Sequence, residues 1–136
     1  MYIYIVTIIR KMLYLSKKDF SSGNPQALSK KLSSKVTIVK FFAPWCGHCK
    51  SSQPQFELLA KVAGNDFNIA TYDVESFSGQ NKIFLEEINN SSLYGFKVEG
   101  YPTHVIFVNG KFKEIYEGPR DAKSMLNKLL QIRTSI

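Results

Sequence analysis

Two cysteines separated by two residues are the part of this sequence best suited to chemistry. Cys46-Gly47-His48-Cys49 places two sulfur atoms one helical turn apart, close enough to join in a small-ring disulfide. If a helix begins here, its positive end holds the Cys46 thiol partly as a thiolate. Cys46 is then the candidate nucleophile that attacks a partner disulfide, and Cys49 is the candidate resolving thiol that attacks Cys46. His48 adds a titratable cation, which favours the thiolate.

A metal site is the competing interpretation of closely spaced cysteines. The chain has only two cysteines and two histidines, so a zinc ion held by these residue types would need Cys46, Cys49, His48 and His104 together. His48 lies inside the cysteine motif, which restricts its geometry. An iron–sulfur cluster shared by two chains is a rarer alternative. We therefore expect no metal and no cofactor other than the redox-active disulfide itself.

Composition indicates one globular domain. A length of 136 residues with 44% hydrophobic and 21% charged residues is enough to bury a core without disulfide staples. The net charge of +7 raises the question of nucleic acid, but the basic residues are spread along the chain without a run of five. We expect no nucleic-acid partner, an ionic-strength-dependent preference for acidic partners, and a monomer.

Residues 1–11 form an apolar extension ahead of a domain at residues 12–136. The extension is β-branched and too short to span a bilayer, and its charges follow the apolar run rather than precede it. It is interpreted as an added strand or a degenerate signal anchor, and we expect no stable membrane span. The C-terminus carries no familiar retention sequence for the endoplasmic reticulum.

Hydrophobic periodicity predicts the elements that position the cysteines. Lys40 alone interrupts the apolar run 36–42, which is typical of a central strand covered on both faces. Asn24-Pro25 is typical of a helix start, and Asn109-Gly110 of a hairpin turn. The sequence predicts strands over residues 12–15, 36–42, 67–74, 103–108 and 111–116, and helices over residues 25–33, 46–63, 80–89 and 121–133. This order indicates an α/β fold with a central mixed sheet flanked by helices.

Residues 41–50, Phe-Phe-Ala-Pro-Trp-Cys-Gly-His-Cys-Lys, resemble the catalytic domains of protein disulfide isomerases in the thioredoxin superfamily. The resemblance extends to Pro54, to Gly100-Tyr101-Pro102-Thr103, and to residues 109–111 and 116–120, and it spans residues 12–132. It implies a thioredoxin fold and exchange of disulfides with protein substrates.

The resemblance also implies roles for individual residues. Pro102 in cis would shape a groove for the substrate backbone, Tyr101 would line it, and Trp45 would offer an exposed aromatic surface to unfolded chains. Arg120 resembles an arginine that swings toward the second cysteine and stabilises its thiolate. The candidate catalytic residues are Cys46, Cys49, Gly47, His48, Lys40 and Arg120, and the candidate substrate-binding residues are Trp45, Tyr101, Pro102 and Thr103.

At Lys40 the sequence departs from the family, which usually carries a buried Asp or Glu here as proton acceptor for the second cysteine. Three alternatives are open. A charged Lys40 would hold Cys49 as a thiolate and favour the reduced pair. A neutral Lys40, favoured by desolvation, would still accept a proton. A Lys40 that extends to solvent would leave resolution of the mixed disulfide slow.

Two other features need an interpretation. Residues 75–92 are longer and more polar than the usual connection, and we expect a tolerated insertion rather than a substrate lip. His104, just beyond Pro102, is expected to be a core histidine rather than a catalytic one.

The leading functional hypothesis is a thiol–disulfide oxidoreductase of the isomerase type, with protein thiols and disulfides as partners. A thioredoxin-like reductant is the nearest alternative, because reduction potential sets the direction of exchange. A client-binding module with weak or no catalysis is a further alternative, favoured by Lys40. The histidine in the motif favours an oxidising lumen such as the endoplasmic reticulum, or an extracytosolic particle or surface, over the cytosol.

Overall fold

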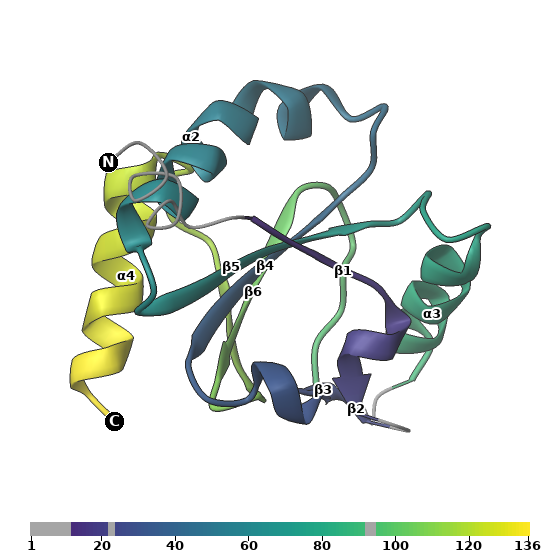
Figure 1. Cartoon of the computed structure of the whole chain (residues 1–136). Coiled ribbons are helices and arrows are strands. Elements are labelled where there is room, and N and C mark those ends of the chain that lie inside the picture. The colour runs from purple at the N-terminus through teal and green to yellow at the C-terminus, as the bar shows by residue number, and fades with distance from the viewer. Residues whose placement is uncertain (1–11, 22–23, 92–94) are drawn as a thin grey trace, which may run out of the picture.

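This computed structural model describes residues 12–21, 24–91 and 95–136. A mixed sheet lies at the centre of the described part (Figure 1). Within those ranges seven strands lie in the order β1-β5-β4-β6-β7-β3-β2. β4 pairs in parallel with β5 and antiparallel with β6. The strands are β1 (Leu13–Leu15), β2 (Phe20–Ser21), β3 (Asn24–Leu28), β4 (Val36–Phe42), β5 (Phe67–Asp73), β6 (Thr103–Val108) and β7 (Lys111–Tyr116).

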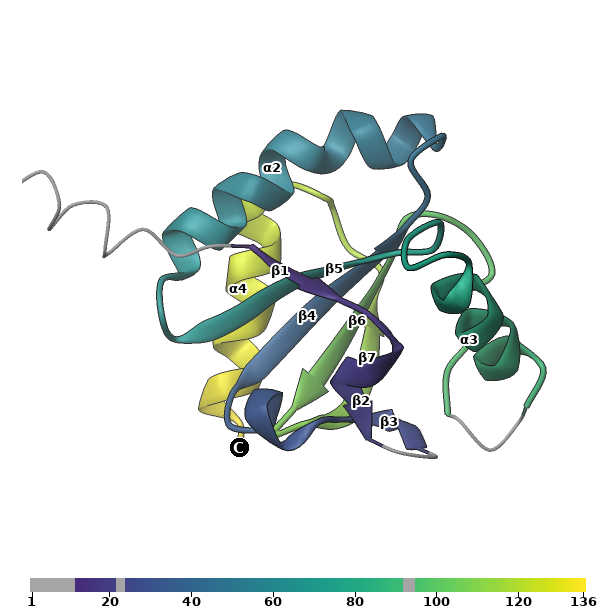
Figure 2. The same ribbon diagram turned by 45° about the vertical axis from the view of Figure 1, so that its right-hand side comes forward.

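Three α-helices in the described residues cover the two faces of this sheet. They are α2 (Gly47–Ala63), α3 (Gln80–Asn89) and α4 (Ala122–Thr134). One core lies between the sheet and α2 with α4, and a second core includes the buried face of α3. Figures 1 and 2 show this arrangement, with α2 and α4 on one side of the sheet and α3 on the other. The expected α/β class with a mixed sheet flanked by helices is confirmed.

Alternation along β4 decides which way Lys40 points. Successive side chains of a strand face opposite sides of the sheet. Val36 and Ile38 belong to the core under α2 and α4, whereas Val39 and Phe41 belong to the core on the α3 side. Lys40 follows Ile38 by two positions, so it points toward α2.

Helix α2 forms as its sequence predicts. Its buried apolar side chains recur every three to four residues, at Phe56, Leu59, Ala60 and Ala63. Pro54 lies inside the helix, and Gly64 ends it with a φ of 60°, a conformation that glycine adopts without steric cost. The helix therefore begins at the cysteine motif and is anchored by its second half.

The helix predicted over residues 25–33 is wrong. The backbone of this segment forms β3, which pairs with β7 at Ala27 and Lys111 and with β2 at Leu28 and Phe20, followed by a single 3₁₀ turn (Lys30–Leu32). The Leu28 N–H also donates to the Gly110 carbonyl. Strand pairing with distant segments outweighs the local helix-start signal of Asn24-Pro25.

The predictions for residues 1–11, an added strand or a signal anchor, lie outside the described residues. β1 confirms the strand expected over residues 12–15, and it pairs in parallel with β5. In the part of the chain that is described, no helix has the length and apolar character needed to cross a membrane.

Candidate active site

The cysteine motif lies at one edge of the sheet, where three segments meet. β4 and β5 are parallel, so their C-terminal ends lie at the same edge, and antiparallel β6 begins there. The chain leaves β4 at Phe42 and reaches Cys46 four residues later, immediately before α2. The Tyr101-Pro102 segment precedes β6. The topology thus brings residues 42–49 together with residues 101–103, more than fifty positions further along the chain.

Cys46 is the N-cap of α2. Its Sγ accepts a hydrogen bond from the backbone N–H of Cys49 at 3.2 Å. The thiol also donates to the carbonyl oxygen of Tyr101 at 3.4 Å. Both cysteines are free, and the two residues come within 2.6 Å of each other. Cys46 is 8% exposed and Cys49 only 3%, so an incoming partner meets Cys46 first.

The two thiols differ in acidity. Burial opposes ionisation of Cys46, but hydrogen bonds from Cys49 and the backbone N–H of His48, with the positive charge of Lys40, lower its pKa below the ordinary thiol value. Burial, together with the hydrogen bond and charge of Cys46, raises the pKa of Cys49 to about 11. Cys46 is therefore the thiol that ionises first, and Cys49 stays protonated while Cys46 is a thiolate.

Aromatic and proline side chains border Cys46. The peptide bond between Tyr101 and Pro102 is cis, as the resemblance implied. The Trp45 ring is 66% exposed and meets the Tyr101 ring edge to face at 5.9 Å between centroids. Thr103 Oγ1 donates to the Gly100 carbonyl at 2.6 Å, which fixes the turn that leads into β6. These residues form a surface beside the nucleophile.

Lys40 does not extend to solvent. Its side chain is fully buried beneath the first turns of α2, and its Nζ donates to the Cys49 carbonyl at 2.9 Å and to Gln53 Oε1 at 2.8 Å. Ser52 Oγ lies 3.3 Å from the same Nζ. The pKa of Lys40 is lowered, chiefly by burial and also by the charge of Arg120, and the electrostatic effect of the cysteine pair opposes this shift.

Arg120 follows β7, in the segment that leads to α4. It is exposed and lines a hollow with Pro102, Thr103 and His104. In the described chain no hydrogen bond or ion pair joins Arg120 to either cysteine. His104 is buried as expected of a core histidine, and burial with the charges of Lys40 and Arg120 lowers its pKa to about 4.

Three polar residues of the site were not singled out from the sequence. Glu75 accepts a hydrogen bond from Trp45 Nε1 at 2.9 Å, across thirty positions of sequence, and no local signal could have found it. Ser52 and Gln53 contact Lys40 from three and four positions beyond Cys49. The helical period would have placed them on the face of α2 that carries Cys49.

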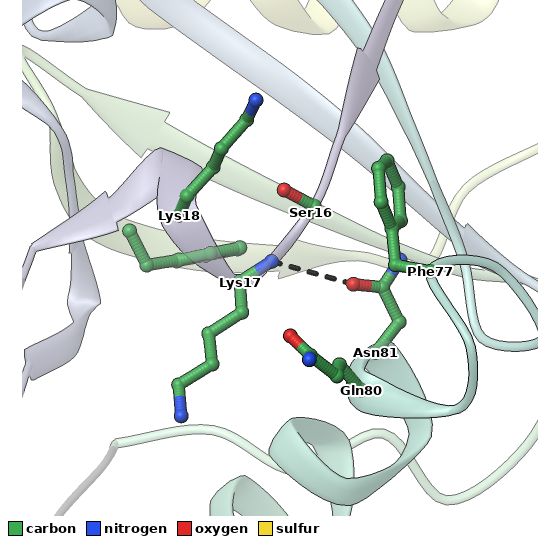
Figure 3. Close-up of a pocket in the computed structure, with 7 residues that line it drawn as sticks. Ser16, Lys17, Lys18, Phe77, Gln80 and Asn81 are labelled. Atoms are coloured by element: carbon green, nitrogen blue, oxygen red, sulfur yellow. Dashed lines mark hydrogen bonds between the residues drawn. The ribbon is translucent and has the colours of Figure 1, made fainter.

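A separate pocket of about 560 Å³ lies between the segment after β1 and the start of α3 (Figure 3). The backbone N–H of Lys17 donates to Asn81 Oδ1 across it. Its lining residues are Ser16, Lys17, Lys18, Phe20, Phe77, Gln80 and Asn81. None of them is a candidate catalytic or substrate-binding residue, so this pocket is distinct from the dithiol site.

A mixed sheet flanked by helices, with an N-capping thiol, a buried second thiol and a cis-proline loop opposite, defines a dithiol protein of the thioredoxin fold. The family model described as Thioredoxin matches residues 12–131. The chain belongs to the thioredoxin family.

Curated relatives place it near the protein disulfide isomerases. The chain is 32% identical over 131 residues to protein disulfide-isomerase 2-3 of Arabidopsis thaliana, and 36% identical over 123 residues to the probable protein disulfide-isomerase ER-60 of Schistosoma mansoni. These alignments cover 90% and 88% of this chain. The chain spans only 27% and 22% of the length of these two relatives.

Solved structures share the fold. The Trx4 domain of ERdj5 superimposes with a TM-score of 0.65 at 20% identity, over 93% of this chain and 99% of that domain. The short form of thioredoxin f from spinach chloroplast gives a TM-score of 0.63 at 23% identity, over 93% of this chain and 96% of that protein. The expected thioredoxin fold is confirmed.

Proposed function

We propose that this chain exchanges disulfides with protein substrates as a protein disulfide isomerase-like oxidoreductase. The observation that carries the proposal is the Cys46 thiol, held by the Cys49 backbone N–H at 3.2 Å and lying 3.4 Å from the Tyr101 carbonyl. At this position Cys46 has a lowered pKa, lies next to its proposed resolving partner Cys49, and borders the proposed substrate groove at Tyr101. The curated relatives named as disulfide isomerases support the same class of reaction.

The proposed reaction proceeds in two exchanges. The Cys46 thiolate attacks one sulfur of a substrate disulfide, a bond forms between them, and the substrate's other sulfur leaves as a thiolate that takes up a proton. Cys49 then loses its proton and attacks Cys46, which forms the intramolecular disulfide and releases the second substrate thiol. The substrate gains two electrons and the pair loses two. The same two exchanges in reverse donate a disulfide to the substrate. If a substrate thiol displaces Cys46 before Cys49 attacks, the substrate disulfide is rearranged without net transfer of electrons.

Substrate is proposed to bind across Trp45, Tyr101, Pro102 and Thr103. The exposed Trp45 ring and the adjoining Tyr101 ring offer apolar contact to an unfolded segment. Gly47 and His48 are exposed at the start of α2, where His48 is proposed to favour the thiolate. Arg120 is proposed to assist ionisation of Cys49 by its positive charge. The same charge lowers the pKa of Lys40, which contacts the Cys49 carbonyl.

The test compares Cys46→Ser and Cys49→Ser with the unaltered chain in insulin reduction and in reactivation of scrambled ribonuclease. Cys46→Ser should lose turnover in both assays, and Cys49→Ser should lose insulin reduction, because net transfer of two electrons needs both thiols. Cys49→Ser should accumulate a covalent mixed disulfide with the substrate on a non-reducing gel, because the resolving thiol is missing, whereas Cys46→Ser should form none. Turnover by Cys46→Ser, or no mixed disulfide with Cys49→Ser, would contradict the proposal.

A client-binding module is the second candidate, and the exposure of Trp45 beside Tyr101 favours it. Such a protein would delay aggregation of an unfolded client while turning over no disulfide. A thioredoxin-like reductant would instead run the same exchange in the reducing direction. The reduction potential of the Cys46–Cys49 pair, measured against glutathione, separates the reductant from the isomerase.

We also propose an oxidising compartment, such as the lumen of the endoplasmic reticulum, as the place of action. The support is the relative named ER-60 and the structural neighbour from ERdj5. The redox state of the pair in cells, trapped by acid and alkylation, tests this location: a largely reduced pair would argue for the cytosol.

A further inference from the structure

The surroundings of the Lys40 Nζ suit a protonated ammonium. An ammonium has three N–H donors, and three oxygen atoms lie within reach: the Cys49 carbonyl at 2.9 Å, Gln53 Oε1 at 2.8 Å and Ser52 Oγ at 3.3 Å. The carbonyl can only accept. Ser52 gives its own hydroxyl proton to the His48 carbonyl at 2.8 Å, so it turns a lone pair toward Lys40.

The other groups packed around Lys40 supply little negative charge. On the sheet its partners in register are Thr71 of β5 and His104 of β6, and the lowered pKa of His104 keeps that ring neutral at physiological pH. The Phe56 ring of α2 lies 5.6 Å from Nζ. Arg120 contributes a second positive charge, and Glu57 of α2 is exposed.

Of the described groups that affect the charge of Lys40, only the cysteine pair is both buried and able to carry a negative charge. A disulfide is neutral, whereas the reduced pair carries a negative charge when Cys46 is ionised, and the lowered pKa of Cys46 favours that state. A buried cation without a nearby anion is costly, and an anion close by offsets part of that cost. The cost falls on the disulfide form and is relieved when the pair is reduced.

We propose that the buried ammonium of Lys40, held by Gln53, stabilises the reduced form of the Cys46–Cys49 pair and so makes its disulfide a donor to substrate thiols. The inference rests on the proposed exchange function and gives it a direction. A carboxylate at the same place would repel the thiolate and favour the disulfide. Lys40 acts through its charge and does not touch the substrate, so it is a positioning residue rather than a catalytic one.

The equilibrium with glutathione measures this effect directly. Two glutathione thiols lose two electrons and two protons to become glutathione disulfide. The Cys46–Cys49 disulfide gains the two electrons and Cys49 takes up one proton. The other proton binds Cys46 below the pKa of that thiol and stays in solution above it. The stabilisation by Lys40 thus appears in the equilibrium constant of a balanced reaction.

Two variants change the charge balance at Nζ. Lys40→Met removes the cation with a side chain of similar length. Gln53→Glu leaves Lys40 in place but puts a carboxylate at hydrogen-bond distance, and the half-buried position of Gln53 should tolerate it. Lys50→Met, on the exposed surface of α2 next to Cys49, removes a nearby cation of the same type and is the matched control.

Both Lys40→Met and Gln53→Glu should shift the glutathione equilibrium toward the disulfide by about tenfold, which is about 30 mV for a two-electron couple. Both should also raise the pKa of Cys46, followed by the ultraviolet absorbance of its thiolate. Lys50→Met should change the equilibrium by less than about fivefold. Equal equilibrium constants in the unaltered chain and Gln53→Glu would overturn the inference even if Lys40→Met does not fold. If the unaltered chain forms no disulfide in glutathione buffers, the exchange function itself fails.

Discussion

Lys40 and His104 lie directly opposite each other on the neighbouring antiparallel strands β4 and β6, and both side chains are buried. Aromatic rings of Phe56 and Tyr116 flank the imidazole, with ring centroids 5.5 and 6.3 Å away. A positive charge on His104 would be repelled by the charges of Lys40 and Arg120. The pKa of His104 accordingly falls to about 4 because of burial, Lys40 and Arg120.

His104 should make the protein sensitive to mild acid. Between the ordinary histidine pKa of about 6.5 and the folded value of about 4, the unfolded chain binds a proton that the folded chain does not. Stability therefore falls as pH drops through this window, by about 3 kcal/mol in all, and His104 adds no further loss below it. His104→Leu should lose this part of the acid dependence, measured by urea unfolding at several pH values.

The matched control for that experiment is the other histidine. His48 is exposed at the start of α2, so His48→Asn should keep the acid dependence of the unaltered chain. Carboxyl groups that titrate at similar pH are common to all three proteins and cancel in the comparison. Identical pH profiles for His104→Leu and the unaltered chain would show that the buried imidazole carries no such penalty.

The two thiols should be alkylated in order. Because hydrogen bonds and Lys40 lower the pKa of Cys46 against the effect of burial, its reaction with iodoacetamide should reach half its maximal rate at a lower pH than the reaction of an ordinary exposed thiol. Cys49, with its pKa raised to about 11 by burial and by Cys46, should stay largely unmodified at that pH. Peptide mass spectrometry assigns the label to each cysteine.

Two variants test how much the side-chain hydrogen bond from Cys49 to Cys46 contributes to the lowered pKa of Cys46. Cys49→Ser keeps a donor beside Cys46, so the alkylation profile of Cys46 should stay low. Cys49→Ala removes the donor and should move the profile to higher pH, while the Cys49 backbone N–H remains. Preferential labelling of Cys49, or coincident profiles of the serine and alanine variants, would contradict this assignment.

The sequence predicted the elements that hold the cysteine motif because each of these elements carries its own local signal. The run 36–42 marks a buried strand, Asn109-Gly110 marks a hairpin whose two residues have φ values of 50° and 83°, and the apolar periodicity of residues 121–133 marks α4. These signals depend only on neighbouring residues, so the folded chain forms the elements that they predict.

Features that depend on contacts between distant segments could not be predicted from the sequence. Residues 24–28 pair as a strand with β2 and β7, although their local sequence favours a helix start. The three alternatives for Lys40 could not be separated from sequence, because its burial depends on how α2 packs over β4. The contact of Trp45 with Glu75 likewise joins two loops that only the sheet brings together.

Trp45 should matter for protein substrates and little for small ones. Its ring is 66% exposed, so Trp45→Ala should change the free energy of unfolding by less than about 0.5 kcal/mol. Loss of an aromatic contact surface should lower the exchange rate with reduced, unfolded protein by about tenfold. The rate with glutathione disulfide, which needs only the Cys46 sulfur, should stay close to that of the unaltered chain.

Glu75→Gln provides the control for Trp45. It keeps an oxygen acceptor for Trp45 Nε1 and removes only the charge, so the ring should hold its position and both rates should remain near normal. An equal loss with protein and with glutathione disulfide in Trp45→Ala would show that the ring supports the dithiol rather than the substrate.

Asn89 should stabilise the long connection without affecting the redox chemistry. Its side chain bonds both ways to Val98, donating Nδ2–H to the carbonyl at 2.7 Å and accepting from the backbone N–H at 2.8 Å. Asn89→Ala removes both bonds and should cost about 2 kcal/mol of unfolding free energy. Asn89→Asp keeps the acceptor and should cost less. Urea unfolding measures both values.

The same variants test whether the segment that follows β5 is a tolerated insertion or a substrate lip. Asn89 anchors its far end, at the C-terminus of α3, and its side chain hydrogen-bonds to the Val98 backbone. An insertion predicts that Asn89→Ala leaves the glutathione equilibrium and the insulin reduction rate unchanged at temperatures where the variant is folded. A selective fall in insulin reduction, with the glutathione equilibrium intact, would instead assign the segment to substrate binding.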